Sequence, residues 1–374
     1  MTLRLVIASP DLDDAGPHRV LTELITGLDR SRFDPVLLVG HGGGRYFDAV
    51  EATLPVEIIG GGRYPVRRFA AAIDQVRPDL VFTTLRMNPT ALAARYLQRY
   101  RPPVIIRQAN AMSVDYARLR NQSLIKHRLA EWGAKRLMRT ADRIVAQSEE
   151  MAAEVRSVTR GKVPVQAIGN PISVEQTRAA AERQRAASGF EAPPGAPALI
   201  SVGRLSYQKG YDLLLSAFAN ILTDHPGAVL TIRGEGEDRA SLEKQARDLG
   251  IDRSVRLPGT SATVLAEIAA ADLFVSSSRY EGFSNAMLEA MALDTPVAAT
   301  DCPGASRDMI IDGRTGMLAS SVDADAIAAA VRRVLSADRA AIAAAARKHV
   351  VRAYDKAAIV RAYEELFEDV AAGS

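Results

Sequence analysis

The most constraining feature of this 374-residue sequence is a repeated alternation of short apolar runs with longer segments that have helical spacing. The runs are rich in leucine and β-branched residues, as buried strands are. Strands separated by helices of about ten or more residues imply parallel βαβ units. In the first half of the chain the expected strands lie at 3–9, 35–40, 56–60, 80–84, 104–108, 143–148 and 163–170.

A polar stretch that contains Ala, Gly and Pro interrupts the alternation, and a second series follows it. Its expected strands lie at 198–204, 228–234, 254–259, 272–278, 295–300 and 316–320. The sequence therefore predicts an α/β protein with two doubly wound, Rossmann-like domains facing across a cleft. We place the N-terminal domain at 1–170, a linker at 171–196 and the C-terminal domain at 197–354.

Composition narrows the classes of protein and of partner. The chain has one cysteine, Cys302, which excludes an intramolecular disulfide and argues against a thiolate zinc site. The net charge of +3 divides unevenly: residues 1–195 hold 28 Lys+Arg against 20 Asp+Glu, and the remainder is acidic. This asymmetry indicates an anionic partner for the N-terminal half, unless it reflects only an Arg-rich composition.

No segment resembles an export signal or a membrane span. The apolar start, MTLRLVIA, is too short for a signal peptide and runs into acidic residues, so it is interpreted as a buried strand. No stretch approaches the roughly 18 apolar residues of a membrane helix. We expect a cytoplasmic protein with, at most, peripheral contact with the inner face of the plasma membrane.

The most informative segment is Arg279–Pro303, which reads RYEGFSNAMLEAMALDTPVAATDCP. A strand ends before it, and a helix begins near Ser284 or Asn285, either of which can act as its side-chain cap. The free amides at such a helix start attract a phosphate or another anion. Glu281 before the cap and Glu289 inside the helix could both address one ligand, although solvated glutamates on an ordinary capped helix fit the spacing equally well.

Two glycine-bounded loops follow other strands of the second series. Arg204 and Lys209 flank a strand-to-helix loop and could converge on a diphosphate, or could be solvated surface cations. Gly234 and Gly236 permit close approach of the backbone, but a dinucleotide fingerprint fails because Arg239 stands where the third glycine is needed. The chain also contains neither a P-loop motif nor a nucleophile elbow.

Together these segments resemble the family 4 retaining glycosyltransferases of GT-B fold. The resemblance covers the whole C-terminal domain in the right order: Gly203-Arg204-Leu205 with Lys209-Gly210, the Gly234-Glu235-Gly236 turn, Val255 to Gly259, the Glu281 to Glu289 E-x7-E motif, and Asp312-Gly313 to Gly316. The sequence of Gly282 to Met291 is most similar to the corresponding segment of enzymes that extend bacterial surface polysaccharides or lipid-linked glycans.

The resemblance implies roles for residues of the C-terminal domain. Arg204 and Lys209 would hold the donor diphosphate, and Glu281 would bind sugar hydroxyls and steady the transition state. Glu289 would bind the ribose. The remaining expected substrate contacts in this domain are Gly234, Arg256, Leu257, Gly282, Phe283, Ser284 and Asn285. Helix 355–372 would pack back on the N-terminal domain, which would bind the acceptor.

The N-terminal domain matches the family pattern less closely. Its first loop keeps Gly16 as a substrate contact, while Pro17 removes an amide that could bind phosphate. Arg107 and Asn110 stand where many relatives have a histidine, and they are either substrate contacts or residues that fix the end of a strand. The basic stretch from Tyr116 to Arg143, with Trp132, is either a core helix with a solvated face or a contact for anionic lipid.

We expect no metal site and no cofactor other than the nucleoside diphosphate sugar that serves as co-substrate. The five histidines lie far apart in the sequence, and the Asp323-Ala324-Asp325 pattern is interpreted as a helix cap. The function predicted is transfer of a hexose-type sugar to a glycan or lipid-linked acceptor, without nucleic acid. Two alternatives remain open at this point: a nucleotide-sugar epimerase of the same fold, and a non-catalytic protein that binds nucleotide sugars or lipid.

Overall fold

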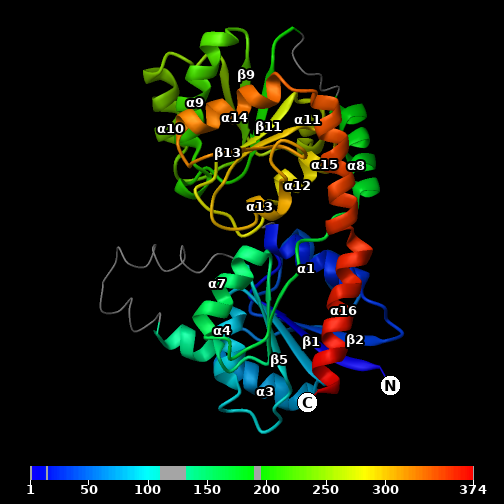
Figure 1. Cartoon of the computed structure of the whole chain (residues 1–374). Coiled ribbons are helices and arrows are strands. Elements are labelled where there is room, and N and C mark those ends of the chain that lie inside the picture. Colours follow the sequence, from blue (N-terminus) through cyan, green and yellow to red (C-terminus); the bar gives the residue numbers. More distant parts are fainter. Residues whose placement is uncertain (1, 14–15, 110–131, 189–194, 374) are drawn as a thin grey trace. The chain divides into compact units, whose positions relative to one another are not determined.

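The computed structural model describes residues 2–13, 16–109, 132–188 and 195–373, and the chain forms two compact units (Figure 1). The first unit comprises Met1–Pro171 and Lys356–Ser374, and the second comprises Ile172–Asp355. Each unit contains one parallel sheet. The expected fold class, α/β with two doubly wound domains, is confirmed in these two sheets.

The sheet of the first unit has seven strands in the order β3-β2-β1-β4-β5-β6-β7. Every strand pair in it is parallel, and β1 pairs with both β2 and β4. The strands are β1 (Leu3–Ser9), β2 (Phe33–Val39), β3 (Val56–Ile58), β4 (Leu80–Thr84), β5 (Val104–Gln108), β6 (Arg143–Ala146) and β7 (Val165–Ala167).

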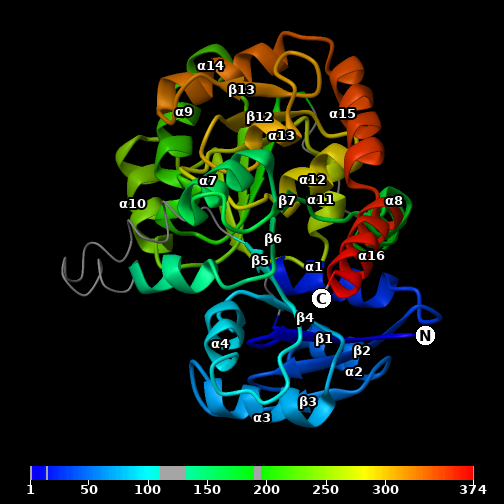
Figure 2. The ribbon, with the colours of Figure 1, turned by 60° about the horizontal axis from the view of Figure 1, so that its bottom comes forward.

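Helices cover both faces of this sheet because its strands are apolar on both sides. Leu5 and Ile7 of β1 face a core that also contains residues of α1 (Gly16–Gly27), α2 (Arg45–Glu51) and α16 (Lys356–Ala372). The alternate residues Val6 and Ala8 face the opposite core. That second core is completed by α3 (Val66–Val76), α4 (Met87–Ala94) and α7 (Glu149–Thr159). Figure 2 shows α1 and α16 on one side of β1 and β2 and α3 on the other.

The sheet of the second unit has six strands in the order β10-β9-β8-β11-β12-β13. The strands are β8 (Ala198–Val202), β9 (Val229–Arg233), β10 (Val255–Gly259), β11 (Leu273–Ser276), β12 (Val297–Thr300) and β13 (Met317–Ala319). One face packs against α9 (Tyr211–Asp224), α10 (Arg239–Asp248) and α14 (Ala324–Leu335). The other packs against α8 (Val174–Ser188), α11 (Val264–Ala270), α12 (Asn285–Ala292) and α15 (Arg339–Tyr354).

Both sheets have a point at which the strand order reverses. In the first unit it lies between β1 and β4, and in the second between β8 and β11. In doubly wound sheets, ligands bind beside such a point, at the carboxyl ends of the strands. The loops after β1, β4, β8 and β11 are therefore the first places to search for functional side chains.

The segment 171–196, which the sequence analysis assigned to a linker, is not a simple linker. The helix α8 occupies Val174–Ser188 and belongs to the second unit, whose boundary lies between Pro171 and Ile172. Gln184 of α8 explains part of this packing, because its Oε1 accepts hydrogen bonds from the backbone N–H groups of Leu265 and Ala266 at the start of α11. The linker assignment was wrong because the apolar face of this helix is narrow: Val174 and Ala181 are its residues in the core of the second unit, too few to form a wide apolar stripe in the sequence.

The chain passes from one unit to the other twice, at two positions that lie together. The backbone of Ile172 forms a parallel bridge with Asp355, and its N–H donates to the carbonyl of Tyr354 at 2.9 Å. After Asp355 the chain enters α16, which packs in the core of the first unit. Among the described helices, none is both long enough and apolar enough to cross a bilayer.

Aromatic packing joins α16 to the sheet of the first unit. Phe367 is fully buried and lies edge-on to Phe33 of β2 and tilted against Phe82 of β4, with ring centroids 6.2 and 5.3 Å apart. One turn before Phe367, the buried carboxylate of Glu364 accepts from the backbone N–H of Asp29 at 2.8 Å and pairs with Arg32. The helix is thus part of the core of this unit.

We expect Phe367→Ala to destabilise the first unit by about 3–5 kcal/mol, because truncation leaves a cavity between two strands and a helix. The control is Arg361→Ala, which alters an exposed residue of the same helix. Urea unfolding of both variants, followed by circular dichroism, measures the difference. Equal stability of the two variants would show that α16 adds little to this core.

Candidate functional site

The loops that follow β8 and β11 are joined to each other by backbone and side-chain hydrogen bonds. The backbone N–H of Arg279 donates to the carbonyl of Gln208 at 2.8 Å, and the Ser277 hydroxyl donates to the carbonyl of Lys209 at 2.8 Å. Gly210 makes this approach possible: its φ is 63°, and a Cβ at this position would lie 2.1 Å from the carbonyl oxygen of Ser277. The two loops therefore form one structural piece.

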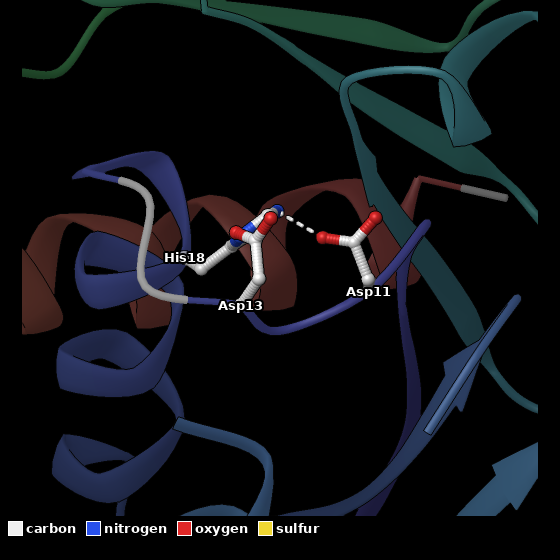
Figure 3. A group of neighbouring side chains, drawn as sticks. All are labelled: Asp11, Asp13 and His18. Atoms are coloured by element: carbon white, nitrogen blue, oxygen red, sulfur yellow. Dashed lines mark hydrogen bonds and ion pairs between the residues drawn. The ribbon is translucent and has the colours of Figure 1, made fainter. Parts of the chain in front are cut away.

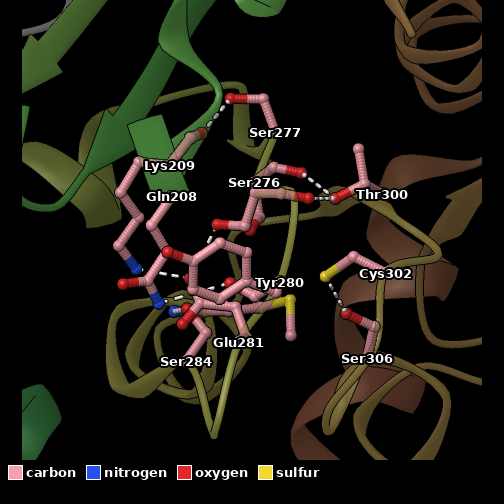
Figure 4. A network of polar contacts seen from close by, with 12 residues as sticks. Gln208, Lys209, Ser276, Ser277, Tyr280, Glu281, Ser284, Thr300, Cys302 and Ser306 are labelled. Carbon is pink, nitrogen blue, oxygen red and sulfur yellow. Dashed lines mark hydrogen bonds and ion pairs between the residues drawn. The ribbon is translucent and has the colours of Figure 1, made fainter. Parts of the chain in front are cut away.

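Lys209 and Glu281 meet where these loops touch (Figure 4). The Nζ of Lys209 donates to the Oε1 of Glu281, and the hydroxyl of Ser278 donates to the same oxygen at 2.6 Å. The two charged side chains are only 19% and 8% exposed. Burial of a charged pair is costly unless its members also make good hydrogen bonds, as this carboxylate does.

The loop after β12 supports Glu281 from the other side. The backbone N–H of Glu281 donates to the carbonyl of Pro303 at 3.0 Å, and Thr300 donates its hydroxyl hydrogen to the carbonyl of Ser278 at 2.5 Å. A Cβ at Gly304 would lie 1.7 Å from the carbonyl oxygen of Glu281, so only glycine fits there. Three strands of the sheet thus contribute to fixing one carboxylate.

The helix α12 begins beside this carboxylate. Ser284 caps it by accepting a hydrogen bond from the backbone N–H of Met287, which confirms the prediction of a cap at Ser284 or Asn285. Gly282 and Phe283 are buried just before the cap, and the ring of Phe283 packs edge-on against Tyr354 at 5.3 Å. Glu289 lies inside the helix and is 7% exposed. The free backbone N–H groups at the start of α12 therefore lie close in sequence to the Glu281 carboxylate.

Of the other residues predicted to contact the donor, Arg204 and Gly234 lie at this carboxyl edge of the sheet, whereas Arg256 and Leu257 lie within β10, where Arg256 is in register with Thr231 of β9. Arg204 follows β8 and is exposed. Gly234 follows β9 with a φ of 147°, where a Cβ would lie 1.9 Å from the carbonyl oxygen of Gly203. Arg256 is exposed on β10, and the carbonyl of the next residue, Leu257, accepts from Arg239 Nη1 at 2.9 Å. The structure thus gathers the loops that the sequence pattern grouped, at the ends of neighbouring strands.

Arg279 is a part of this site that the sequence analysis did not identify. Its guanidinium binds both carboxylate oxygens of Asp212, at 2.7 and 2.6 Å, and lies 4.1 Å from the centre of the Tyr207 ring. The pKa of Asp212 is lowered by the hydrogen bonds and the charge of Arg279. The pair fixes the turn that carries Lys209. No spacing in the sequence links these two residues, so no motif could have revealed them.

The first unit has its own polar group at the point where its strand order reverses (Figure 3). The Nδ1 of His18 lies 2.5 Å from the Oδ1 of Asp13, and its Nε2 lies 3.3 Å from the Oδ1 of Asp11. Arg86, which follows β4, lies 3.2 Å from the other oxygen of Asp11. One ligand atom from each of Asp11, Asp13 and His18 lies within 4.8 Å of the others, a grouping that the sequence did not reveal because the start of α1 brings His18 back toward the two carboxylates.

The predicted substrate contacts of the first unit are only partly described. Gly16 is the first residue of α1, and Asn110 lies outside the described residues. Arg107 is 2% exposed: its Nε donates to the hydroxyl of Tyr363 at 3.2 Å, and its Nη2 donates to the Oδ1 of Asn170 at 2.7 Å. Arg107 thus ties β5 to α16, and this geometry favours the structural alternative over substrate contact.

Exposed aromatic and apolar side chains gather after α4. Tyr96 and Leu97 are 70% and 53% exposed, and Arg99 and Arg101 beside them are exposed as well. Most of the basic stretch from Tyr116 to Arg143 lies outside the described residues. Within its described part, Trp132 is exposed and Arg136 lies 5.7 Å from the centre of its ring. Apolar and cationic groups together are typical of surfaces that meet anionic lipid.

Two family models match adjacent parts of the chain. The model for glycosyl transferases group 1 matches residues 182–349, and the model for a glycosyl transferase 4-like domain matches residues 15–171. Together the two matches take in most of the sequence.

Curated relatives and solved structures agree with these models. A lipopolysaccharide core biosynthesis glycosyltransferase, LpsE of Rhizobium meliloti, is 34% identical over 47% of this chain and 51% of its own length. The lipopolysaccharide core mannosyltransferase LpsB of the same organism is 27% identical over 72% of this chain and 76% of its own length. The chain thus spans about half the length of the first relative. The crystal structure of Anabaena HepE with UDP is 18% identical, with a TM-score of 0.79 over 99% of this chain and 100% of HepE.

The single cysteine, Cys302, lies in the loop after β12 and does not have the properties of a nucleophile. Cys302 is 2% exposed, and burial raises the pKa of its thiol to about 11. We therefore expect native protein to react with an aromatic disulfide reagent very slowly at pH 8, because the thiolate fraction grows only as the pH approaches the raised pKa. Absorbance of the released thiol follows the reaction. Protein unfolded in urea serves as the control and should react at once; equally fast labelling of native protein would contradict the raised pKa.

Proposed function

Because this chain belongs to the family 4-type glycosyltransferases of GT-B fold, we propose that it transfers a hexose-type sugar from a nucleoside diphosphate sugar to a glycan or lipid-linked acceptor. The acceptor would belong to the synthesis of a bacterial surface polysaccharide, as in lipopolysaccharide. The observation that carries the proposal is the joined pair of loops in which Lys209 and Glu281 meet beside the start of α12.

The donor would bind at the carboxyl edge of the second sheet. Lys209 and Arg204 supply cations for the diphosphate, and the first amides of α12 add donors aimed at the same anion. Glu281 would bind the sugar and stabilise positive charge that develops on it in the transition state. Glu289 would hold the ribose, and the backbone around Arg256 and Leu257 would meet the base.

We also propose that the transfer retains the anomeric configuration and needs neither a metal ion nor an organic cofactor. Fixed cations at the diphosphate can stabilise the leaving group in the role that a metal has in other transferases. The Oε1 of Glu281 already accepts hydrogen bonds from Lys209 and Ser278, an arrangement that suits electrostatic stabilisation better than covalent attack. Attack from the front face of the sugar would account for retention without an enzyme nucleophile.

The acceptor would bind to the first unit. Asp11, His18 and Arg86 support this assignment, because they place both signs of charge at the point where the first sheet reverses its strand order. The exposed Tyr96 and Leu97, with Arg99 and Arg101 beside them, would give peripheral contact with an anionic membrane that holds a lipid-linked acceptor.

We expect Lys209→Ala and Glu281→Gln each to lower sugar transfer by about 100-fold or more, because each removes a charge that acts on the transition state. Lys244→Ala is the control, since Lys244 is an exposed lysine of the same unit and pairs only at the surface with Asp248. The assay measures nucleoside diphosphate released from UDP- and GDP-sugars in the presence of lipid-linked glycans. Thermal melting confirms that each variant is folded.

Undiminished transfer by both variants would overturn the proposed mechanism. Conversion of the donor to its epimer without any acceptor would indicate an epimerase instead. Binding of nucleotide sugars without turnover under any condition would favour a non-catalytic binding protein.

A further inference from the structure

One oxygen of Glu281 is fully occupied within the protein. Its Oε1 accepts from both the Nζ of Lys209 and the hydroxyl of Ser278. A carboxylate oxygen has two lone pairs, so Oε1 has no further capacity along them. In the part of the chain that the structure describes, the hydrogen bonds to this side chain all go to Oε1. The oxygen left for a sugar hydroxyl is therefore Oε2.

The two residues that hold Oε1 differ in what donor binding would do to them. Under the proposed function Lys209 holds the diphosphate, so its ammonium must share or give up its contact with Glu281 when the donor arrives. A lysine ammonium on a flexible four-carbon stem can make that move. The carboxylate would then depend on its second partner to keep its orientation.

Ser278 is well placed to be that partner. Its side chain is 1% exposed, at the end of β11, and its own carbonyl accepts from the Thr300 hydroxyl at 2.5 Å. Its hydroxyl reaches Glu281 from only three residues away, at 2.6 Å. The hydrogen bonds of Ser278 on the described chain that involve a side chain join it to Glu281 and Thr300, and not to Arg204 or Lys209, the residues proposed to bind the diphosphate.

We propose that Ser278 is a positioning residue, whose hydroxyl keeps the Oε1 of Glu281 in place while Lys209 engages the donor diphosphate, so that Oε2 stays directed at the sugar. The inference rests on the proposed function and assigns to this serine a part in sugar recognition. Ser278 acts through Glu281 and needs no contact of its own with the substrate.

The adjacent serine provides a matched control. Ser277 is as buried as Ser278, and its hydroxyl also makes a hydrogen bond, to the carbonyl of Lys209 at 2.8 Å. Its hydroxyl does not contact Glu281. A purely structural effect of removing a buried hydroxyl should therefore appear in Ser277→Ala and Ser278→Ala alike.

The first measurement is calorimetric binding of UDP and of UDP-glucose, with GDP and GDP-mannose as a second pair, to wild type, Ser277→Ala, Ser278→Ala and Ser278→Thr. We expect Ser278→Ala to bind the nucleoside diphosphate as wild type does but to lose most of the extra affinity that the sugar adds. Ser278→Thr, which keeps a hydroxyl, should recover it. Melting temperatures of the two alanine variants should fall by similar amounts.

The second measurement is the steady-state rate of transfer. We expect Ser278→Ala to lower kcat by about 10- to 100-fold, since a small misplacement of a catalytic group costs rate. The KM for the donor should rise by no more than the loss of sugar-dependent affinity found by calorimetry. Ser277→Ala should alter kcat much less.

The outcomes separate the two proposals. If Ser278→Ala and Ser277→Ala lose sugar-dependent affinity equally, or if Ser278→Ala weakens the bare nucleotide as much as the nucleotide sugar, Ser278 is not a positioning residue. If wild type transfers no sugar but binds nucleotide sugars, and Ser278→Ala loses the sugar-dependent part of that affinity, the transfer proposal fails while the role of Ser278 stands. If no nucleotide sugar binds wild type, both are overturned.

Discussion

The parallel pairing of β8 with β11 is the constraint on which the proposed donor site depends. These strands are far apart in the sequence but adjacent in the sheet, so the loops after them emerge side by side. Close approach then becomes possible only because Gly210 and Gly304 lack side chains where backbone carbonyls lie. Three loops hold Glu281 within this frame: its carboxylate accepts from Lys209 and Ser278, and its backbone N–H donates to the carbonyl of Pro303. The buried charge is thus both paired and hydrogen-bonded.

The first unit also has polar side chains at the point where its strand order reverses, but the residue types differ from those in the second unit. Its sheet also reverses order beside the first strand, and Asp11 and Arg86 meet there from the loops after β1 and β4. Leu85, just before Arg86, has a φ of 55°, which costs free energy for a residue other than glycine. Such strain persists where the surroundings fix the backbone, as the packed ends of two strands do here. The group around Glu281 and the group around His18 thus lie at equivalent points of the two sheets.

The sequence could predict those features that depend on residues close to one another along the chain. Strand positions, the cap at Ser284 and the cap at Asp323 all follow from residues within a few positions of each other, and the structure contains both caps. It missed α8, whose packing depends on Gln184 and the distant start of α11, and it missed the approach of His18 to Asp11. It also had no means of finding the Arg279–Asp212 pair, because partners 67 residues apart leave no pattern in the sequence.

The return of α16 to the first unit has a consequence for the order of folding. Its residues complete a core whose other members, such as Phe33 and Phe82, precede it by the entire second unit. During synthesis the first sheet must therefore wait, with one apolar face incompletely covered, until residues 356–373 leave the ribosome. The second unit has no such dependence, since its segments are contiguous from Ile172 to Asp355. The domain that is made first is therefore finished last, and a chaperone that shields exposed apolar surface would act on it during the interval.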